Sequence, residues 1–195
     1  MTMTSDARQP QREPPPIGPG RLVLVVGPSG AGKDTLIAAV RQRMMADEAF
    51  LFPRRIVTRP SSAAEDNVEA DEATFTRIAE AGGLALSWTA HGHRYGIPAV
   101  VDHAVYEGRT AVCNVSREVV PLARQRYANV TVVEVTAPPE ILKNRVSARS
   151  RPSDGEPAAR VERRVTAAVD ADVTIVNDGP LDPAVDRLLA VVARA

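Results

Sequence analysis

The chain has 195 residues, a length that one domain with a short tail accounts for. Its 24 Lys and Arg balance its 24 Asp and Glu, so no overall positive field attracts nucleic acid or an anionic membrane. The single cysteine, Cys113, excludes a disulfide framework and a cysteine-only zinc site, and no apolar run reaches the roughly 18 residues of a membrane span. We therefore expect a soluble, cytoplasmic protein without a nucleic-acid or membrane partner. Its polar N-terminus is also unlike a secretory signal.

The chain begins with a segment that is not expected to fold. Residues 1–20 are proline-rich and lack a periodic apolar face, which predicts a disordered extension ahead of a single domain over 21–195. The first predicted strand is the apolar run RLVLVV at 21–26, which is typical of a strand buried on both faces. The glycine-rich loop GPSGAGKDT at 27–35 follows, and it leads into a predicted helix over 34–45.

Strand-like runs and helical patterns alternate through the rest of the chain. The predicted strands cover 55–58, 84–88, 110–115, 130–136 and 172–177, and the predicted helices cover about 71–81, 98–107, 117–126, 139–149, 157–168 and 182–192. This alternation predicts an α/β fold with a parallel sheet covered by helices on both faces. Two polar stretches interrupt it. We expect about 53–97 to form a substrate-binding insertion and about 148–160 to form a mobile, arginine-rich lid.

The loop at 27–35 has the glycines and the lysine of a phosphate-binding loop between a strand and a helix. Glycines let the backbone curl so that successive N–H groups point at phosphate oxygens, and the helix adds the positive end of its dipole. Lys33 can reach the outer phosphates. The predicted ATP-binding residues are Gly27, Pro28, Ser29, Gly30, Ala31, Gly32, Lys33, Asp34, Thr35 and, from a later helix, Arg145.

The residue after the loop lysine departs from the strict pattern, which has Ser or Thr there to hold Mg²⁺. Here that position is Asp34, and the first hydroxyl follows at Thr35. A carboxylate aimed at phosphates without a cation would repel them, so we expect Asp34 to act through Mg²⁺. Two arrangements stay open. Asp34 binds the ion directly, or it binds a coordinated water while Thr35 takes the inner position.

The order of these motifs resembles guanylate kinase, a P-loop NTPase with the nucleoside monophosphate kinase fold. The finer details resemble the related ribose 1,5-bisphosphate phosphokinase family. The shared motifs are GPSGAGK at 27–33, TR at 58–59, HGHRYGIP at 91–98 and VNDG at 176–179 for the first, and GKDT at 32–35, ALSW at 85–88, HGHRYGI at 91–97 and NVSR at 114–117 for the second. The resemblance covers nearly the whole chain after residue 20. It implies that ATP phosphorylates ribose 1,5-bisphosphate to phosphoribosyl diphosphate (PRPP) during phosphonate breakdown.

The resemblance also implies which acceptor the site binds. Guanylate kinase reads guanine with carboxylates, and the corresponding positions here carry Ser87, Asn114 and Ser116. A buried guanine would leave its N–H donors unpaired against such groups, whereas hydroxyls and an amide suit a sugar ring. We therefore expect a small phosphorylated sugar as the acceptor.

Site roles follow from the same resemblance. Arg59 and Tyr95 are expected to hold a phosphate of the acceptor, with Thr58 and Arg117 as weaker candidates. Lys33 and the lid arginines are expected to neutralise charge on the transferring group, because guanidinium matches phosphate oxygens in a fork. Those arginines are Arg149, Arg160 and Arg163, together with Arg145. An acceptor phosphate is largely dianionic at neutral pH, so no general base is expected.

Two other functions stay open at this point. One is a guanylate kinase that converts GMP to GDP. The other is a non-catalytic binding module on a guanylate kinase-like fold, which the intact Lys33 and loop glycines disfavour. The sequence also leaves open whether the chain forms a homodimer.

Overall fold

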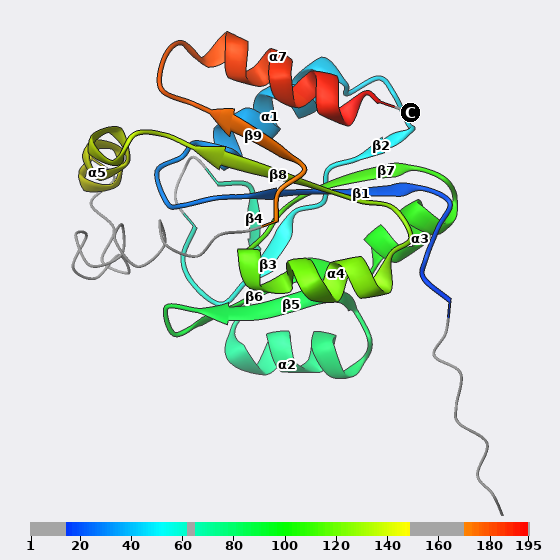
Figure 1. Cartoon of the computed structure of the whole chain (residues 1–195). Helices are drawn as coiled ribbons and strands as arrows, with labels where there is room; N and C mark the ends of the chain where they lie inside the picture. The colour runs from blue at the N-terminus through cyan, green and yellow to red at the C-terminus, as the bar shows by residue number, and fades with distance from the viewer. Residues whose placement is uncertain (1–14, 62–64, 149–169, 195) are drawn as a thin grey trace, which may run out of the picture.

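The computed structural model describes residues 15–61, 65–148 and 170–194. Its centre is a five-stranded sheet in which every neighbouring pair is parallel, as the alternating pattern predicts. The strands, in spatial order, are β2 (Phe50–Leu51), β7 (Thr110–Asn114), β1 (Arg21–Val26), β8 (Val130–Thr136) and β9 (Val173–Val176). The apolar run of β1 therefore lies in the middle of the sheet (Figure 1).

Helices cover both faces of this sheet, and the two sides of β1 belong to two separate cores. Val23 and Val25 pack with α1 (Lys33–Arg43), α5 (Pro139–Ser147) and α7 (Leu181–Val192). Leu22 and Leu24 pack on the other side with α3 (Val100–Tyr106), the 3₁₀ turn η1 (Arg117–Val119) and α4 (Val120–Arg126). Figure 1 shows α1 and α7 above the sheet and α3 and α4 below it. Alternation along a strand buried on both faces produces this division.

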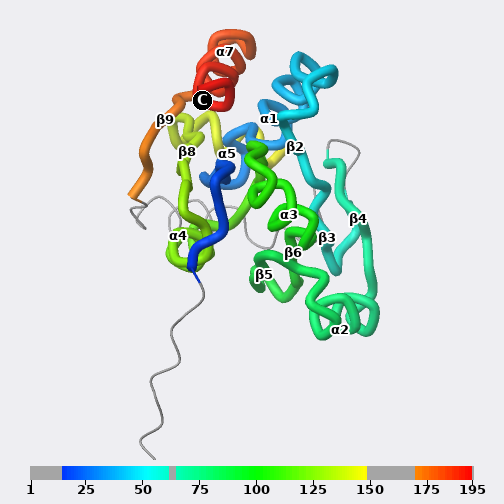
Figure 2. The backbone as a smooth tube through the Cα atoms, turned by 90° about the vertical axis from the view of Figure 1, so that its right-hand side faces the viewer, coloured from blue at the N-terminus to red at the C-terminus, as the bar shows by residue number. Residues whose placement is uncertain are grey.

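A second, mixed sheet packs against the core that contains Leu22 and Leu24. Its spatial order is β4 (Asn67–Glu69), β3 (Arg55–Val57), β6 (His93–Pro98) and β5 (Leu84–Ala90), and only the β3–β4 pair is parallel. Helix α2 (Glu72–Glu80) connects β4 to β5, with Phe75 as its buried residue. The tube in Figure 2 shows these elements beside the central sheet, with α2 outermost.

The strands and helices that fall on described residues were predicted to within a few residues, but three strands were missed. These are β2, β4 and β6. The motif HGHRYGIP contains the last of these strands. His91 and Gly92 turn with positive φ, and His93–Pro98 then pairs with β5. The predicted helix over 157–168, and all of the predicted lid except Ala148, lie outside the described residues.

The end of the N-terminal extension is more ordered than the sequence indicates. Ile17 forms a parallel bridge with Tyr127, and the N–H of Gly20 donates to the carbonyl of Val105 at 2.8 Å. The expectation of disorder up to residue 20 is therefore wrong for residues 17–20. Composition alone does not reveal this order. It depends on two backbone hydrogen bonds of 2.8 Å, one on either side of Ile17, that hold the segment against the end of α4.

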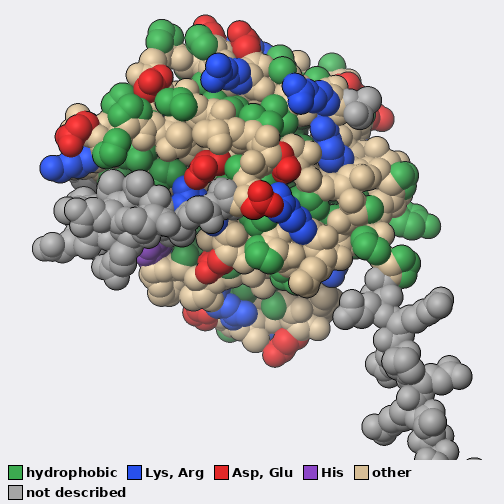
Figure 3. Space-filling model, in the orientation of Figure 1, with side chains coloured by type: hydrophobic (Ala, Val, Ile, Leu, Met, Phe, Trp, Pro, Cys, Tyr) green, Lys and Arg blue, Asp and Glu red, His purple; other side chains and the backbone are tan. Residues whose placement is uncertain are grey.

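The remaining sequence expectations concern burial and surface charge. Cys113 is buried in β7, and burial raises the pKa of its thiol far above the ordinary value. On the face drawn in Figure 3, Lys and Arg side chains are interspersed with Asp and Glu. Among the helices that the structure describes, none is long and apolar enough to cross a membrane.

Candidate active site

The phosphate loop follows β1 at the carboxyl edge of the central sheet. The conformation of two glycines is fixed by close neighbours. Gly27 has φ +138°, and a Cβ there would lie 2.0 Å from the carbonyl oxygen of Val135. Gly32 has φ +91°, and a Cβ there would lie 2.4 Å from Nδ2 of Asn177. Any other residue would be strained at these positions and would also collide with a neighbour.

Lys33 starts α1, and its side chain folds back over the loop. Its Nζ donates to the carbonyl oxygens of Gly27 at 2.8 Å and Pro28 at 2.9 Å. The ammonium is therefore held above the loop backbone. Ser29 is half-buried within the loop, and Thr35 is exposed on the first turn of α1.

Asn177, just after β9, fastens the loop to the neighbouring strand end. Its Nδ2 donates to the carbonyl of Ala31 at 2.8 Å, and its own N–H donates to Thr136 at 2.7 Å. Arg145 of α5 donates to the carbonyl of Asn177 at 2.9 Å. Asn177 is buried, so its satisfied amide stabilises the loop. The motif VNDG contained this residue, but no role for it was predicted.

Asp34 joins the nucleotide loop to the second sheet. Its Oδ1 accepts from Nδ2 of Asn114 at 2.7 Å and from Nη2 of Arg55 at 3.0 Å. All three residues line one open hollow, whose wall comes from α1, the β2–β3 segment, β3, β4 and β7. Arg55 was not predicted to belong to the site. One available signal was its position at the start of a predicted strand, four residues before Arg59.

Arg59 and Tyr95, expected to act together, are in contact. Nε of Arg59 lies 3.1 Å from the Tyr95 hydroxyl. The two Nη atoms of Arg59 donate to the carboxylate of Glu65 at 2.9 and 3.0 Å. Burial alone would lower the pKa of Arg59, but the hydrogen bonds to Glu65 and Tyr95 outweigh it and raise that pKa above its usual range. Arg59 is therefore a permanent buried cation. Glu65 was also missed by the sequence reasoning.

An aromatic pair supports this cluster. Trp88 stacks on Tyr95 with ring centroids 5.4 Å apart and planes at 8°. Ser87 is exposed, and because it precedes Trp88 in the same strand it lies on the other face. The structure thus does not bring Ser87 to the Arg59–Tyr95 cluster.

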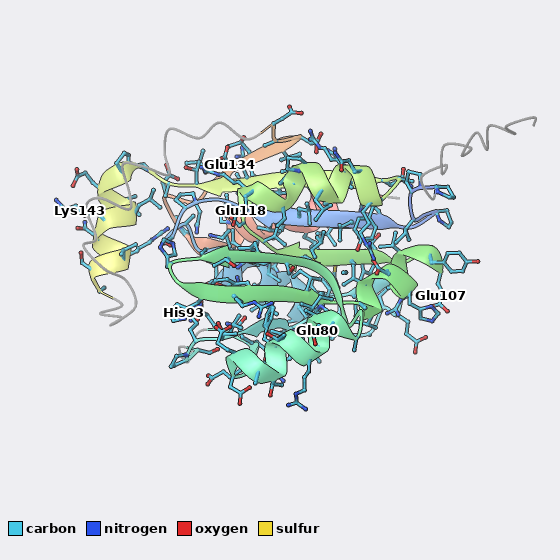
Figure 4. All side chains as sticks on the ribbon, turned by 90° about the horizontal axis from the view of Figure 1, so that it is seen from below. Glu80, His93, Glu107, Glu118, Glu134 and Lys143 are labelled. Atoms are coloured by element: carbon cyan, nitrogen blue, oxygen red, sulfur yellow. The ribbon has the colours of Figure 1, made fainter. Side chains whose placement is uncertain are left out.

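The other proposed acceptor residues have contacts of their own. The hydroxyl of Thr58, just after β3, accepts from the N–H of Arg94 in β6 at 2.9 Å. Nη2 of Arg117 lies 2.5 Å from Oε1 of Glu134 in β8. Figure 4 labels Glu134 near Glu118. Ser116 is half-buried and immediately precedes η1.

Two residues that Figure 4 labels lie at the α5 end of the molecule. Lys143 projects outward from α5, and His93 lies at the same end (Figure 4). Arg149, Arg160 and Arg163, expected to act from the lid, lie outside the described residues.

Comparison with known proteins identifies the family. A family model described as an AAA domain matches residues 22–173. A ribose 1,5-bisphosphate phosphokinase PhnN from Methylobacterium radiotolerans is 55% identical over 172 residues, which is 88% of this chain and 97% of the relative. The chain belongs to the ribose 1,5-bisphosphate phosphokinase family. A second family member, from Bradyrhizobium diazoefficiens, is 49% identical over 191 residues, which is 97% of this chain and 96% of that protein.

A solved structure shows the fold. Guanylate kinase from Anaplasma phagocytophilum superposes with a TM-score of 0.61 at 17% identity, covering 89% of this chain and 84% of the other. The chain is therefore an α/β kinase of the ribose 1,5-bisphosphate phosphokinase family, with the guanylate kinase-like P-loop fold.

Proposed function

We infer that this chain transfers the terminal phosphoryl group of ATP to the C1 phosphate of ribose 1,5-bisphosphate, giving PRPP and ADP, in phosphonate breakdown. The observation that carries this proposal is 55% identity, over nearly the whole length of both chains, to a kinase named for that acceptor. The geometry supports it, since contacts through Asp34, Arg55 and Glu65 link the phosphate loop to the buried Arg59. We also place the reaction in the cytoplasm, where a cysteine without a disulfide partner stays reduced.

The donor side of the site is the phosphate loop. Its N–H groups and Lys33 would hold the outer phosphates of ATP. Arg145 is connected to the loop through Asn177, to which it donates and which in turn donates to Ala31. Asp34 and Thr35 are the oxygen donors that would hold Mg²⁺. In the part of the chain that the structure describes, no group of three or more acidic, His or Cys side chains gathers. Mg²⁺ commonly takes one or two protein oxygens and completes its shell with substrate phosphates and water, so these two donors fit it. When bound, it supplies positive charge between the phosphates.

The acceptor side is the Arg59–Tyr95 cluster. Arg59 would hold the acceptor phosphate, whose second pKa near 6 leaves it largely dianionic at neutral pH. One of its oxygens forms the new P–O bond while the bond from the terminal phosphorus to the bridging oxygen of ATP breaks, and ADP leaves with that electron pair. The nucleophile is ionised beforehand, so no residue has to remove a proton. Catalysis is then positioning and charge neutralisation, to which we assign Lys33 and, from the lid, Arg149, Arg160 and Arg163.

Two positions that the resemblance matches to the guanine-binding carboxylates of guanylate kinase favour a sugar over guanine. Asn114 uses its amide to donate to Asp34, and Ser116 presents a short hydroxyl. Neither carries the carboxylate that a buried guanine needs for its N1–H and amino group. The likeness to guanylate kinase, at 17% identity, shows the fold alone.

An assay with two acceptors tests the proposal. We would measure ADP release by the full-length chain with Mg²⁺ and ATP, using either ribose 1,5-bisphosphate or GMP. We expect kcat/KM for the bisphosphate to exceed that for GMP by at least about 100-fold. A Lys33→Ala variant should remain folded and lose turnover. Comparable turnover of GMP would refute the proposal.

A further inference from the structure

Arg55 connects the two halves of the site. It begins β3 in the second sheet, and its side chain reaches Asp34 on the helix that follows the phosphate loop, 3.0 Å away. Its Nε donates to Oδ1 of Asn67 at 3.1 Å. The side chain is only 11% exposed. Two contacts from different elements therefore fix the direction in which this guanidinium points.

Arg55 and Arg59 lie on either side of one carboxylate. Oε1 of Glu65 is 2.9 Å from Nη2 of Arg59 and 4.0 Å from Nη2 of Arg55. The side chains of Glu65 and Arg59 are 5% and 8% exposed. Two nearly buried guanidinium groups are thus close enough to contact one small molecule at the same time.

The acceptor has a use for a second cation. Each phosphate monoester carries about −1.5 to −2 charge at neutral pH, and ribose 1,5-bisphosphate has two of them. Arg59 accounts for only one. A guanidinium fork binds a phosphate through two parallel N–H···O bonds, which are stronger than neutral hydrogen bonds. Nη1 of Arg55 makes no hydrogen bond with any residue in the described ranges, so its two N–H groups can serve such a contact.

The other arginines of the hollow are less suited. Arg41 and Arg54 have side chains 42% and 53% exposed, and both pair with Asp66 at 2.6 Å. Water screens such exposed charges, whereas a nearly buried cation keeps most of its attraction for an anion.

We propose that Arg55 binds the second phosphate of the acceptor, the one that does not receive the transferred group. It thereby makes this site select a bisphosphate over a monophosphate. Asp34 and Asn67 are positioning residues that hold the guanidinium in place. This inference rests on the proposed function, because it assigns the part of the acceptor that lies away from the reacting oxygen.

The test compares two acceptors that differ by that one phosphate. We would measure kcat/KM for ribose 1,5-bisphosphate and for ribose 1-phosphate with the full-length wild type, Arg55→Met and Arg41→Met. Arg55→Met keeps the apolar stem but removes the charge. Arg41→Met is the matched control, since Arg41 lines the same hollow but is exposed. Thermal melting would confirm that each variant is folded.

Arg55→Met should lower kcat/KM for the bisphosphate about 10- to 100-fold, the range of a lost hydrogen bond to a charged group, and change the value for ribose 1-phosphate less than threefold. Arg41→Met should change both values less than threefold. If wild-type turnover of ribose 1-phosphate is too slow, calorimetric affinities of the two acceptors should show the same ratio. Should Arg55→Met fail to fold, Arg55→Lys replaces it, with a selective loss of about tenfold.

Equal losses for both acceptors would overturn the inference and leave Arg55 as a support for Asp34, which a raised KM for ATP would also indicate. An effect of Arg41→Met as large as that of Arg55→Met would overturn it as well. Failure of the proposed function looks different, because the wild type itself would then not turn over ribose 1,5-bisphosphate.

Discussion

Gly32 has no room for a side chain. It combines a φ of +91° with a neighbour, Asn177, whose Nδ2 would lie 2.4 Å from an added Cβ. Gly82 also has positive φ, +70°, but nothing lies within 4 Å of its Cβ position. The two glycines therefore separate the cost of backbone conformation from the cost of a collision at the nucleotide site.

We predict that Gly32→Ala lowers the affinity for ATP at least about 100-fold, because Asn177 must move and release the carbonyl of Ala31. Gly82→Ala should cost only about 1–2 kcal/mol of unfolding free energy and leave ATP affinity unchanged. Calorimetric ATP titration and urea unfolding measure the two quantities. Equal ATP affinity in both variants would show that the Asn177 contact does not shape the loop.

Asp34 has two neighbours that a neutral amide could still satisfy in part. Asp34→Asn keeps the size of the side chain and removes its charge, so the loop should stay folded. If Asp34 acts through Mg²⁺, the Mg²⁺ concentration needed for half-maximal ATP binding should rise about tenfold or more. Titrating Mg²⁺ against ATP binding by calorimetry measures this. An unchanged Mg²⁺ requirement would remove Asp34 from the metal site.

Single residues of the site could be predicted only where their signal is local. The loop glycines and Lys33 form a contiguous pattern between a strand and a helix, so the sequence alone could propose them. Asn177 and Ala31 are 146 positions apart in sequence, and Arg55 is 21 positions from Asp34. Such contacts depend on strand order and on pairing, which residue patterns alone do not specify. Ser87 was predicted to contact the acceptor, but Trp88, the next residue in β5, occupies the face that carries Tyr95. Ser87 therefore lies on the opposite face of the strand.

At the scale of elements, a polar cluster joins α3 and α4 at the edge of the core that contains Leu22 and Leu24. The hydroxyl of Tyr127, at the end of α4, donates to Asp102 of α3 at 2.6 Å, and Arg126 pairs with the same carboxylate at 2.5 Å. Burial, followed by the hydrogen bond to Asp102, raises the pKa of Tyr127 well above its usual value of about 10.

This cluster predicts how stability changes at high pH. The folded pKa of Tyr127 is above the unfolded one, so its contribution is complete below about pH 10 and is lost as the pH rises toward the folded pKa. Tyr127→Phe should cost about 1 kcal/mol at pH 7 and should weaken the fall in stability above pH 10. Urea unfolding at pH 7 to 10.5 measures both. An identical alkaline slope in wild type and variant would contradict the assignment.

Elements were predicted well when they bury a long apolar run and poorly when pairing alone creates them. The strand at 21–26 was predicted because five of its six residues are buried. β2 has two residues and β4 has three with only Asn67 buried, and both are strands because β7 and β3 lie beside them. The polar start of HGHRYGIP hid β6 in the same way.

At the scale of the whole molecule, charged side chains connect the central sheet and its helices with the second sheet, to which we assign the acceptor. The central parallel sheet carries the phosphate loop, and the smaller mixed sheet carries Arg59 and Tyr95. The Asp34–Arg55 ion pair joins the two. The parallel α/β architecture followed from the alternation of elements. The order β2-β7-β1-β8-β9 did not, because one alternating pattern allows several strand orders. That residues 53–97 act as an insertion and 148–160 as a lid stays a proposal.

The most direct test asks which atom receives the phosphoryl group. Phosphorus NMR of the full-length chain with ATP, Mg²⁺ and ribose 1,5-bisphosphate follows every phosphate of the reaction together. We predict that the C1 monoester signal disappears and that two coupled diphosphate signals replace it, in step with ADP formation, while the C5 monoester persists. A C1 signal that stays a monoester while ATP is consumed, or phosphoryl transfer only when GMP replaces the sugar, would contradict this account.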